Sequence, residues 1–151
     1  MRVIAFALAL CLSACGGTKA YRSDAPNNLT VLSELRGAKG ALHIHRVTPD
    51  CRTEYLGSVA LDQASVELAL PVDRPIYLTV SFDTSSFLSG SRSMSAGTLL
   101  AARPALRYEL AASYRDSIYS LALREVDRKG AKQELPRRDL GSCRPPKVLS
   151  S

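Results

Sequence analysis

Tryptophan is absent from the 151 residues, and aromatic residues together make up only 6% of the chain. The core must therefore be built from leucine, valine, isoleucine and alanine, within a hydrophobic content of 46% that is ordinary for a globular protein. Histidine occurs only twice, as His43 and His45. A zinc site needs three or four ligands, so histidine alone cannot complete one.

Motifs of the common catalytic classes are also missing. The sequence holds no P-loop, no G-x-G-x-x-G fingerprint and no zinc-ribbon spacing. Ser91, Ser93 and Ser95 are candidate nucleophiles, but they stand in neither a G-x-S-x-G nor an S-x-x-K motif. The carboxylates Glu109 and Asp116 have no informative spacing. The sequence therefore predicts no catalytic residue and no cofactor.

The chain begins with a targeting segment. Arg2 supplies a positive charge, and an apolar run over 3–12 follows it. Such a run has the length of the hydrophobic part of an export signal, about 7–15 residues, whereas a membrane span needs about 20. We therefore predict that this segment directs export and does not belong to the fold.

The signal ends in Leu12-Ser13-Ala14-Cys15. This stretch resembles the lipobox of bacterial lipoproteins, which consists of a leucine, two small residues and a cysteine. The resemblance implies that the Cys15 thiol receives a diacylglyceryl group, that the chain is cut before Cys15 and that the new amino terminus is acylated. Three acyl chains hold a protein on a membrane far better than one, at about 0.8 kcal/mol per buried CH₂.

The residue after the cysteine bears on the destination. In Gram-negative lipoproteins an aspartate at this position favours retention in the inner membrane, so Gly16 implies the inner leaflet of the outer membrane, facing the periplasm. The alternative is a secretory peptide that is cut after Ala14 and leaves Cys15 as a free thiol. An exposed thiol is a liability in an oxidising compartment, which favours the lipoprotein.

The other cysteines fit an exported chain. Cys11 leaves with the signal, so Cys51 and Cys143 remain as an even pair. A disulfide between them closes a loop of about 92 residues, for which chain entropy gives about 4.5 kcal/mol of stabilisation. Two unpaired thiols are the alternative.

Alternating apolar and polar residues predict short β-strands from about Leu29 onward. The strongest prediction is 76–82, which places Ile76, Leu78, Val80 and Phe82 on one face. The remaining predicted strands are 41–47, 55–61, 64–70, 105–114 and 117–126, with hairpin turns at Asp62-Gln63 and Arg115-Asp116 and a short hairpin around Lys129-Gly130.

The secondary structure of two segments needs a separate argument. Leucine and alanine in 117–126 also suit a helix, but the tight turn signals on both sides favour a strand. The Ser-rich stretch 83–97 has the composition of a loop.

The pattern predicts an all-β fold, a single small antiparallel sandwich or barrel of about seven strands. The predicted organisation is a signal peptide (1–14), a lipidated cysteine with a flexible Gly- and Pro-containing tether (15–28), the β-domain (29–144) and a disordered tail (145–151).

His43 and His45 lie on one face of the predicted strand 41–47. They are the only candidate metal ligands, and no nearby acidic or cysteine residue completes a set, so two solvent-facing histidines are the expected outcome.

The net charge is +6, with 20 basic and 14 acidic side chains. This balance suits anionic lipid, lipopolysaccharide phosphate or a cell-wall polymer, and it also occurs in proteins with no such partner. Nucleic acid is excluded because the export signal removes the protein from the cytoplasm. The last quarter is the most basic part, where Arg124, Arg128, Lys129, Lys132, Arg137, Arg138 and Arg144 outnumber Glu125, Asp127, Glu134 and Asp139.

The sequence thus predicts a membrane-anchored, non-catalytic binding or scaffold module of the cell envelope. Its expected partners are the bilayer, through acylated Cys15, and an envelope protein complex or anionic polymer. An inhibitor of a cell-wall hydrolase is one alternative, although lysozymes are themselves usually basic and like charges repel. An enzyme whose site includes His43 or His45 is the other.

Overall fold

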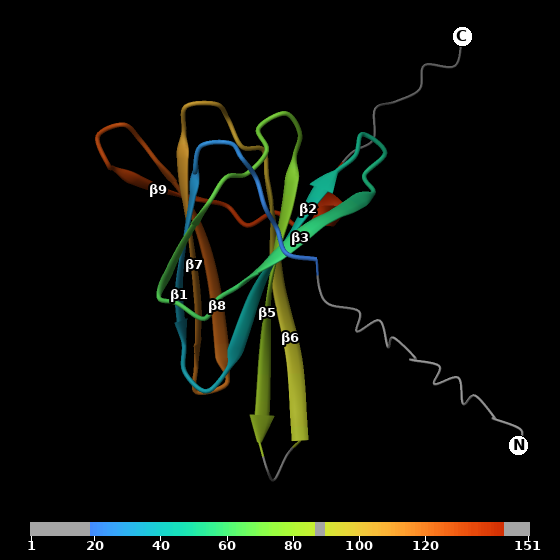
Figure 1. The fold of residues 1–151 in the computed structure, drawn as a ribbon, viewed down its shortest axis with the longest axis vertical. Coiled ribbons are helices and arrows are strands. Elements are labelled where there is room, and N and C mark those ends of the chain that lie inside the picture. Colours follow the sequence, from blue (N-terminus) through green and yellow to red (C-terminus); the bar gives the residue numbers. More distant parts are fainter. Residues whose placement is uncertain (1–18, 87–89, 144–151) are drawn as a thin grey trace, which may run out of the picture.

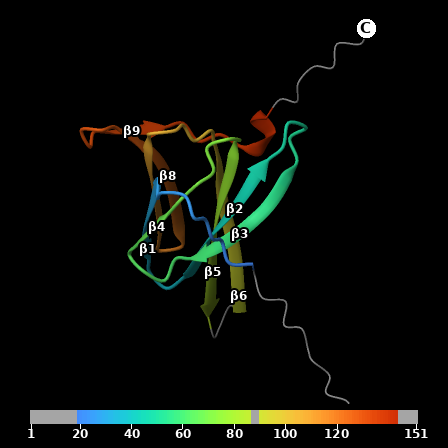
Figure 2. The same cartoon turned by 45° about the horizontal axis from the view of Figure 1, so that its top comes forward.

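The computed structural model describes residues 19–86 and 90–143. Two β-sheets pack face to face as a sandwich (Figure 1; Figure 2), which confirms the predicted all-β class. One sheet has five strands in the order β4-β1-β7-β8-β9, and the other has four in the order β3-β2-β5-β6. The strands are β1 (Leu29–Leu35), β2 (Lys39–Val47), β3 (Thr53–Ala60), β4 (Ser65–Leu68), β5 (Ile76–Ser86), β6 (Gly90–Leu100), β7 (Arg107–Arg115), β8 (Ile118–Val126) and β9 (Lys132–Leu135), with a 3-10 turn η1 (Leu140–Ser142) near the C-terminal end.

The strand count exceeds the expected seven, and one pairing is not antiparallel. β1 and β7 run parallel, because the chain leaves β1 for the other sheet and returns to lie beside it as β7. The segment 117–126 is a strand and not a helix, since β8 pairs with β7 along its whole length. Within the described ranges, no helix is long and apolar enough to cross a bilayer.

The core lies between the sheets and follows the predicted alternation. Side chains that alternate along each strand are buried toward the opposite sheet, while their neighbours point outward. Phe82 and Tyr114 stack with ring centroids 6.2 Å apart and close one end of the core. The fully buried side chains include Leu29, Val31, Leu42, Ile44, Ile76, Leu78, Val80, Phe82, Tyr108 and Leu110.

The loop predicted for 83–97 is wrong for most of that stretch. β5 continues to Ser86, and β6 begins at Gly90 and pairs with β5 in continuous antiparallel register. Small side chains alternate inward along β6, where Ala96 and Thr98 are each only 2% exposed. β5 is rich in β-branched and aromatic residues and is the strand with which β6 pairs. This pairing overrides the weak strand propensity of serine and glycine in β6. Residues 87–89 lie outside the described ranges.

The hairpin predicted at Asp62-Gln63 is also wrong. β3 and β4 belong to different sheets, because β4 pairs with β1. Leu61 is buried where the chain crosses between the sheets. The turn between β7 and β8 is a hairpin as expected, but it is centred one residue later, at Asp116 and Ser117. Their φ angles of 51° and 66° are typical of the two-residue type I′ turn.

The hairpin expected around Lys129-Gly130 is present between β8 and β9. The Asp127 carboxylate accepts hydrogen bonds from the backbone N–H groups of Lys129 and Ala131, both at 2.8 Å. Gly130 has a φ of 83°, a left-handed conformation that glycine adopts without a steric penalty.

Part of the predicted tether (15–28) belongs to the sandwich, because the chain is already bound to it at Lys19. The backbone at 19–21 forms a parallel bridge with the outer edge of β3: Ser58 N–H donates to Lys19 C=O, and Tyr21 N–H donates to Ser58 C=O, both at 2.9 Å. The Tyr21 hydroxyl donates to the Ala69 carbonyl at 2.5 Å. The side-chain amide of Asn28 exchanges two hydrogen bonds with the Leu70 backbone. Residues 19–28 are therefore part of the domain.

The predicted disulfide is present. Cys51, in the β2–β3 turn, is bonded to Cys143, with 5.8 Å between the Cα atoms and 92 residues between the two positions. Cys143 ends a segment that first crosses β6, where Leu99 N–H donates to Arg138 C=O at 2.7 Å. The disulfide thus fixes the last described residues at the β2–β3 turn, on the other side of the four-stranded sheet from β6. Residues 144–151, which include the predicted tail, lie beyond the described part.

Candidate functional site

Four rings gather on the outer face of the four-stranded sheet. His43 and His45 come from β2, Tyr55 from β3 and Tyr77 from β5, and the Tyr55 ring centroid lies 6.2 Å from that of His43 and 5.2 Å from that of His45. His45 and Tyr77 are 6.4 Å apart. We call these four residues the His–Tyr face. They lie together because outward-pointing residues of paired strands are neighbours across the sheet.

The bulge in β3 and a glycine in β6 shape this face. The β2–β3 register shifts between Ile44 and His45, which places Tyr55 opposite His45. The Tyr77 hydroxyl lies over Gly97, where an added Cβ atom would approach it to 2.5 Å. Because Gly97 has no side chain, the Tyr77 ring lies flat across the sheet toward β6.

The electrostatic state of His45 follows from its partial burial. Desolvation lowers the pKa of His45 below its usual value, and the neighbouring His43 lowers it further. The neutral form of the ring is therefore favoured to a lower pH than in a free histidine. Its Nδ1 atom is buried and has no hydrogen-bond partner within the described residues.

The two histidines do not assemble a metal site with other described side chains. His43 Nε2 lies 3.1 Å from Ser81 Oγ. In the residues that the structure covers, no three histidine, cysteine, aspartate or glutamate side chains lie close enough together to hold an ion.

The His43–Ser81 contact brings a possible base to a hydroxyl, which is one half of a serine-hydrolase arrangement. The sequence did not single out Ser81. The other half requires a group that orients the imidazole, and no carboxylate is hydrogen-bonded to His43 among the described side chains. Ser91, Ser93 and Ser95 lie exposed along β6, away from either histidine in the sheet order. The contact is thus a cross-strand hydrogen bond on a sheet surface.

A groove of about 610 Å³ opens at the end of the sandwich near the β1–β2 turn. Its apolar wall includes Leu35, Ala38 and Leu61, and Lys39 and Asp83 stand at its margin. Gly40 lets the Leu35 side chain enter, because an added Cβ atom would collide with Leu35 Cδ1. Sequence reasoning missed this groove, since its residues come from four separate segments with no shared motif.

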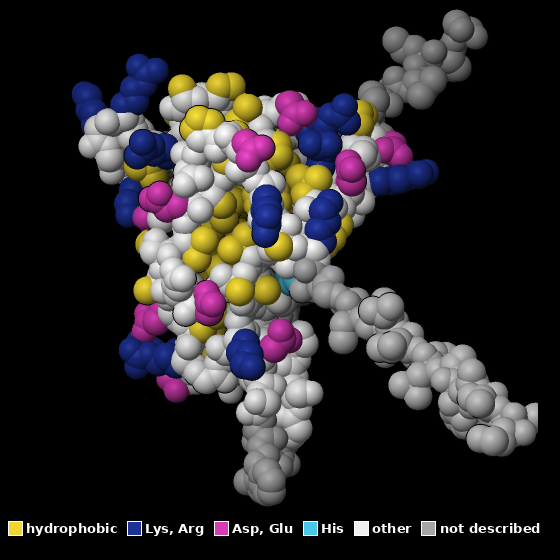
Figure 3. Space-filling model, in the orientation of Figure 1, with side chains coloured by type: hydrophobic (Ala, Val, Ile, Leu, Met, Phe, Trp, Pro, Cys, Tyr) yellow, Lys and Arg dark blue, Asp and Glu magenta, His cyan; other side chains and the backbone are white. Residues whose placement is uncertain are grey.

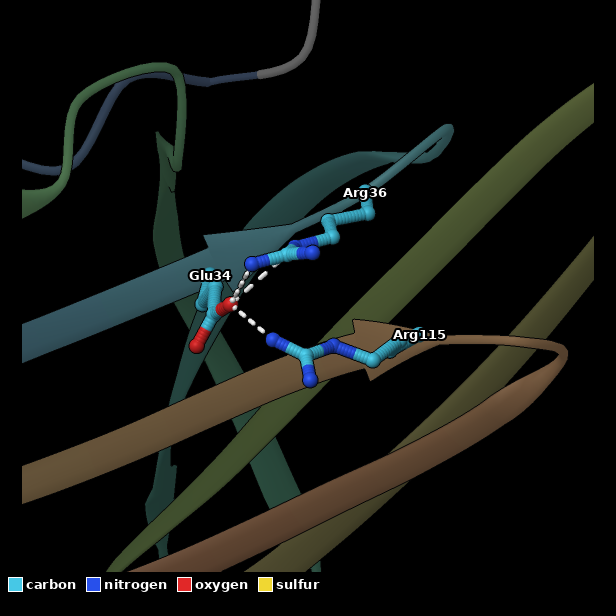
Figure 4. Close-up of polar contacts among 3 residues, drawn as sticks. All are labelled: Glu34, Arg36 and Arg115. Carbon is cyan, nitrogen blue, oxygen red and sulfur yellow. Dashed lines mark hydrogen bonds and ion pairs between the residues drawn. The ribbon is translucent and has the colours of Figure 1, made fainter.

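Beside this groove, Glu34 binds two arginines (Figure 4). The Glu34 carboxylate accepts hydrogen bonds from Arg115 at 2.7 Å and from Arg36 at 3.1 Å. Arg115, and then Arg36, lower the pKa of Glu34 below its usual range. All three side chains are more than half exposed, and such ion pairs contribute little to stability. The cluster orients surface side chains without enclosing a site.

The basic last quarter does not form one patch. Arg124 and Lys132 both bind the buried carboxylate of Glu109, at 3.0 and 2.6 Å. Arg137 donates from Nε to the Gly97 carbonyl of β6 at 3.0 Å. Basic side chains project at the β8–β9 turn, which carries Arg128 and Lys129 (Figure 3). The charge is thus divided between structural contacts and an exposed turn, and Arg144 lies outside the described residues.

Comparisons with known proteins add a likeness of fold. No family model matches the chain, and no curated protein matches it. Among solved structures, the chain is similar to sea bream transthyretin in complex with thyroxine, at 16% identity over 64% of this chain and 93% of that chain, with a TM-score of 0.45. It is also similar to transthyretin from Sparus aurata, at 14% identity over 66% of this chain and 98% of that one, with a TM-score of 0.44.

Proposed function

We propose that this protein is a lipid-anchored, periplasm-facing binding module of the bacterial cell envelope. The observation that carries the proposal is the state of the cysteines. Cys51 and Cys143 are joined, so Cys15, within Leu12-Ser13-Ala14-Cys15, is the remaining cysteine of the mature chain. A structural disulfide belongs to an oxidising compartment, and the lipobox supplies the anchor in that compartment.

The His–Tyr face is the surface that we assign to partner binding. Tyrosines are enriched where proteins meet, because each combines a large apolar ring with a polar tip. Tyr55 is 36% exposed, so part of its side chain is open to a partner. The face binds without catalysing a reaction, and its partner is an envelope protein.

The anchor is tested by labelling cells with radioactive palmitate. We expect the wild-type protein to be labelled and recovered with membranes, and Cys15→Ser to lose both properties. Cys11→Ser is the matched control, because Cys11 lies upstream of the expected cut and its loss should leave labelling unchanged. Continued labelling of Cys15→Ser would refute the lipoprotein.

The binding face is tested by crosslinking in intact envelopes. We expect Tyr55→Ala to reduce the yield of a defined crosslinked complex at least several-fold. Ile118→Ala is the control, because Ile118 is 71% exposed on the other sheet. Equal yields from the two variants would exclude the His–Tyr face, and capture of a single cell-wall hydrolase would favour the inhibitor.

A further inference from the structure

A second surface lies where the chain enters the domain. A groove of about 350 Å³ is bordered by Lys19 and Arg22 from the entering segment and by Arg46 from β2. Tyr21, Leu56 and Pro71 form its apolar part. We call it the anchor groove. It combines three cationic side chains with an apolar floor, which is the chemistry of a phospholipid headgroup and the first carbons below it.

Arg46 is the most constrained of the three cations. Its side chain is 33% exposed, and Glu54 approaches it at 3.6 Å. The Nε atom is buried and has no hydrogen-bond partner within the part of the chain described. Because the side chain as a whole is 33% exposed, an anion can reach the outer part of this guanidinium, next to the buried Nε–H group.

The length of chain before Lys19 determines what can reach the groove. Only Gly16, Gly17 and Thr18 separate Cys15 from Lys19. Whatever their conformation, four Cα-to-Cα steps span at most about 14 Å. The backbone at 19–21 is bonded to Ser58 of β3, so lipidation of Cys15 would hold this edge of the sandwich at the headgroup layer.

The close packing of the entering segment on β3 keeps the connection between the domain and Cys15 short. Gly57 has a φ of 148°, and an added Cβ atom would lie 2.7 Å from both Cα and N of Tyr21. The Tyr21 backbone therefore rests directly on Gly57. The Tyr21 hydroxyl bond to Ala69 fixes the same segment from its other side, so the short connection is not lengthened by a loose stretch within 19–21.

From these observations we infer that the anchor groove binds the phosphate of an anionic phospholipid in the leaflet that holds the lipid anchor. The sandwich then lies against the bilayer with the β3 edge inward. This inference rests on the proposed function, because it requires acylated Cys15. It adds an orientation and a second, reversible lipid contact.

The groove is tested on the soluble mature chain, with Ser in place of Cys15, by NMR titration. Dihexanoylphosphatidylglycerol below its micelle concentration should shift the Nε–H signal of Arg46. Arg46→Gln and Arg22→Gln should each weaken binding about fivefold, the effect of about 1 kcal/mol per basic residue. Arg107→Gln, on the other sheet, removes the same charge and should leave binding unchanged.

Two reference ligands identify the source of the phosphate. Dihexanoylphosphatidylcholine should bind more weakly, because its headgroup carries no net charge. Inorganic phosphate should also bind more weakly, because it lacks the glycerol and acyl carbons that contact Leu56 and Pro71. Equal binding of inorganic phosphate would overturn a lipid site in favour of a free anion, and the absence of any shift at Arg46 would overturn the site itself.

The orientation is tested on the lipidated protein in supported bilayers by neutron reflectometry. Ten Gly/Ser residues inserted between Gly17 and Thr18 release the domain from its short connection. We expect the domain of this long-leash protein, the variant with the ten-residue insertion, to stay against a bilayer that contains anionic lipid. The same variant with Arg22→Gln and Arg46→Gln should show the domain farther from the bilayer. If the long-leash protein leaves anionic and neutral bilayers alike, the inference fails while Cys15 labelling, and with it the proposed function, still stands.

Discussion

The two edge strands of the four-stranded sheet, β3 and β6, are covered by different parts of the chain. On the β3 edge, the entering chain covers Ser58 on both backbone groups and closes over Gly57. On the β6 edge, Arg137 and Arg138 cover the backbone at Gly97–Leu99. The hairpin of β5 and β6 then extends beyond the rest of the sandwich (Figure 1; Figure 2).

The difference shows that one edge of a sheet can bind the entering chain while the strands at the other edge extend beyond the sandwich. A bare edge strand invites pairing with other chains. The β3 edge avoids this by pairing with the protein's own N-terminal segment, which also leads to the expected anchor. The projecting part of β6 carries Arg92 and small polar side chains, and edge charges discourage pairing. The covered edge is hydrogen-bonded and closely packed, and the first residues of β6 are exposed, so changes at the two should have unequal effects.

The largest effect should come from the disulfide, which secures the segment that covers β6. We expect Cys51→Ser with Cys143→Ser to lower the free energy of unfolding by about 4.5 kcal/mol, the chain-entropy value for such a loop, with removed disulfides in general costing about 2–5 kcal/mol. The urea midpoint measures the loss. Reduced wild-type protein should match the double variant, and an unchanged midpoint would mean that the C-terminal segment is held by its hydrogen bonds alone.

The next effect should come from opening the covered edge. Gly57→Ala places a methyl group into the Tyr21 backbone, so we expect a loss of about 1–3 kcal/mol, as for other overpacked sites. Amide hydrogen exchange at Ser58 and Tyr21 should accelerate in parallel. Gly141→Ala is the control, since no atom lies within 4 Å of its added Cβ. Full protection at Ser58 in Gly57→Ala would show that the added methyl group is accommodated without opening this edge, and would contradict the tight fit.

A smaller effect should follow from loss of the Tyr21 hydroxyl, which removes one hydrogen bond to Ala69. The expected loss for Tyr21→Phe is about 1 kcal/mol, measured by urea unfolding. Tyr55→Phe serves as control, because its ring lies tilted against the two histidine rings and its exposed hydroxyl can bond water. An equal loss in both variants would indicate a general cost of removing a phenol and not a specific restraint on the entering chain.

Much of this fold follows from period-two alternation, and the errors have a common cause. The strand 76–82 is predictable because Ile76, Leu78, Val80 and Phe82 are large and alternate strictly. β6 alternates too, through Met94, Ala96, Thr98 and Leu100, but its outward serines also favour turns, and only its pairing with β5 decides between the two. The crossing at Asp62-Gln63 depends on β1, a partner distant in sequence.

The candidate sites also contain a part that the sequence shows locally and a part that only the folded chain brings together. The His43 and His45 pair is visible in the sequence because both residues are local to one strand. Tyr55 and Tyr77 join them only through strand pairing and a bulge. The anchor groove unites four separate segments, and no spacing rule could have predicted it. The disulfide was predictable only after the signal and the lipobox had accounted for Cys11 and Cys15, because Cys51 and Cys143 were then the remaining pair.

The smallest effect concerns His45, which lies beside the covered edge and packs against Tyr55 of β3. Burial lowers the pKa of His45 in the folded protein, while the unfolded chain titrates near 6.5. As the pH falls through 6.5, the unfolded state binds a proton that the folded state still excludes, so stability decreases until the folded pKa is also passed. His45→Gln should flatten this part of the stability curve, measured as urea midpoint against pH. His43→Gln should reduce the slope only in part, because burial is the larger cause of the lowered pKa and the neighbouring His43 is the smaller one. If His45→Gln keeps the full slope, the ring is solvated in the folded state, and the β3 side of the sheet is then more open than the hydrogen bonds of the entering segment imply.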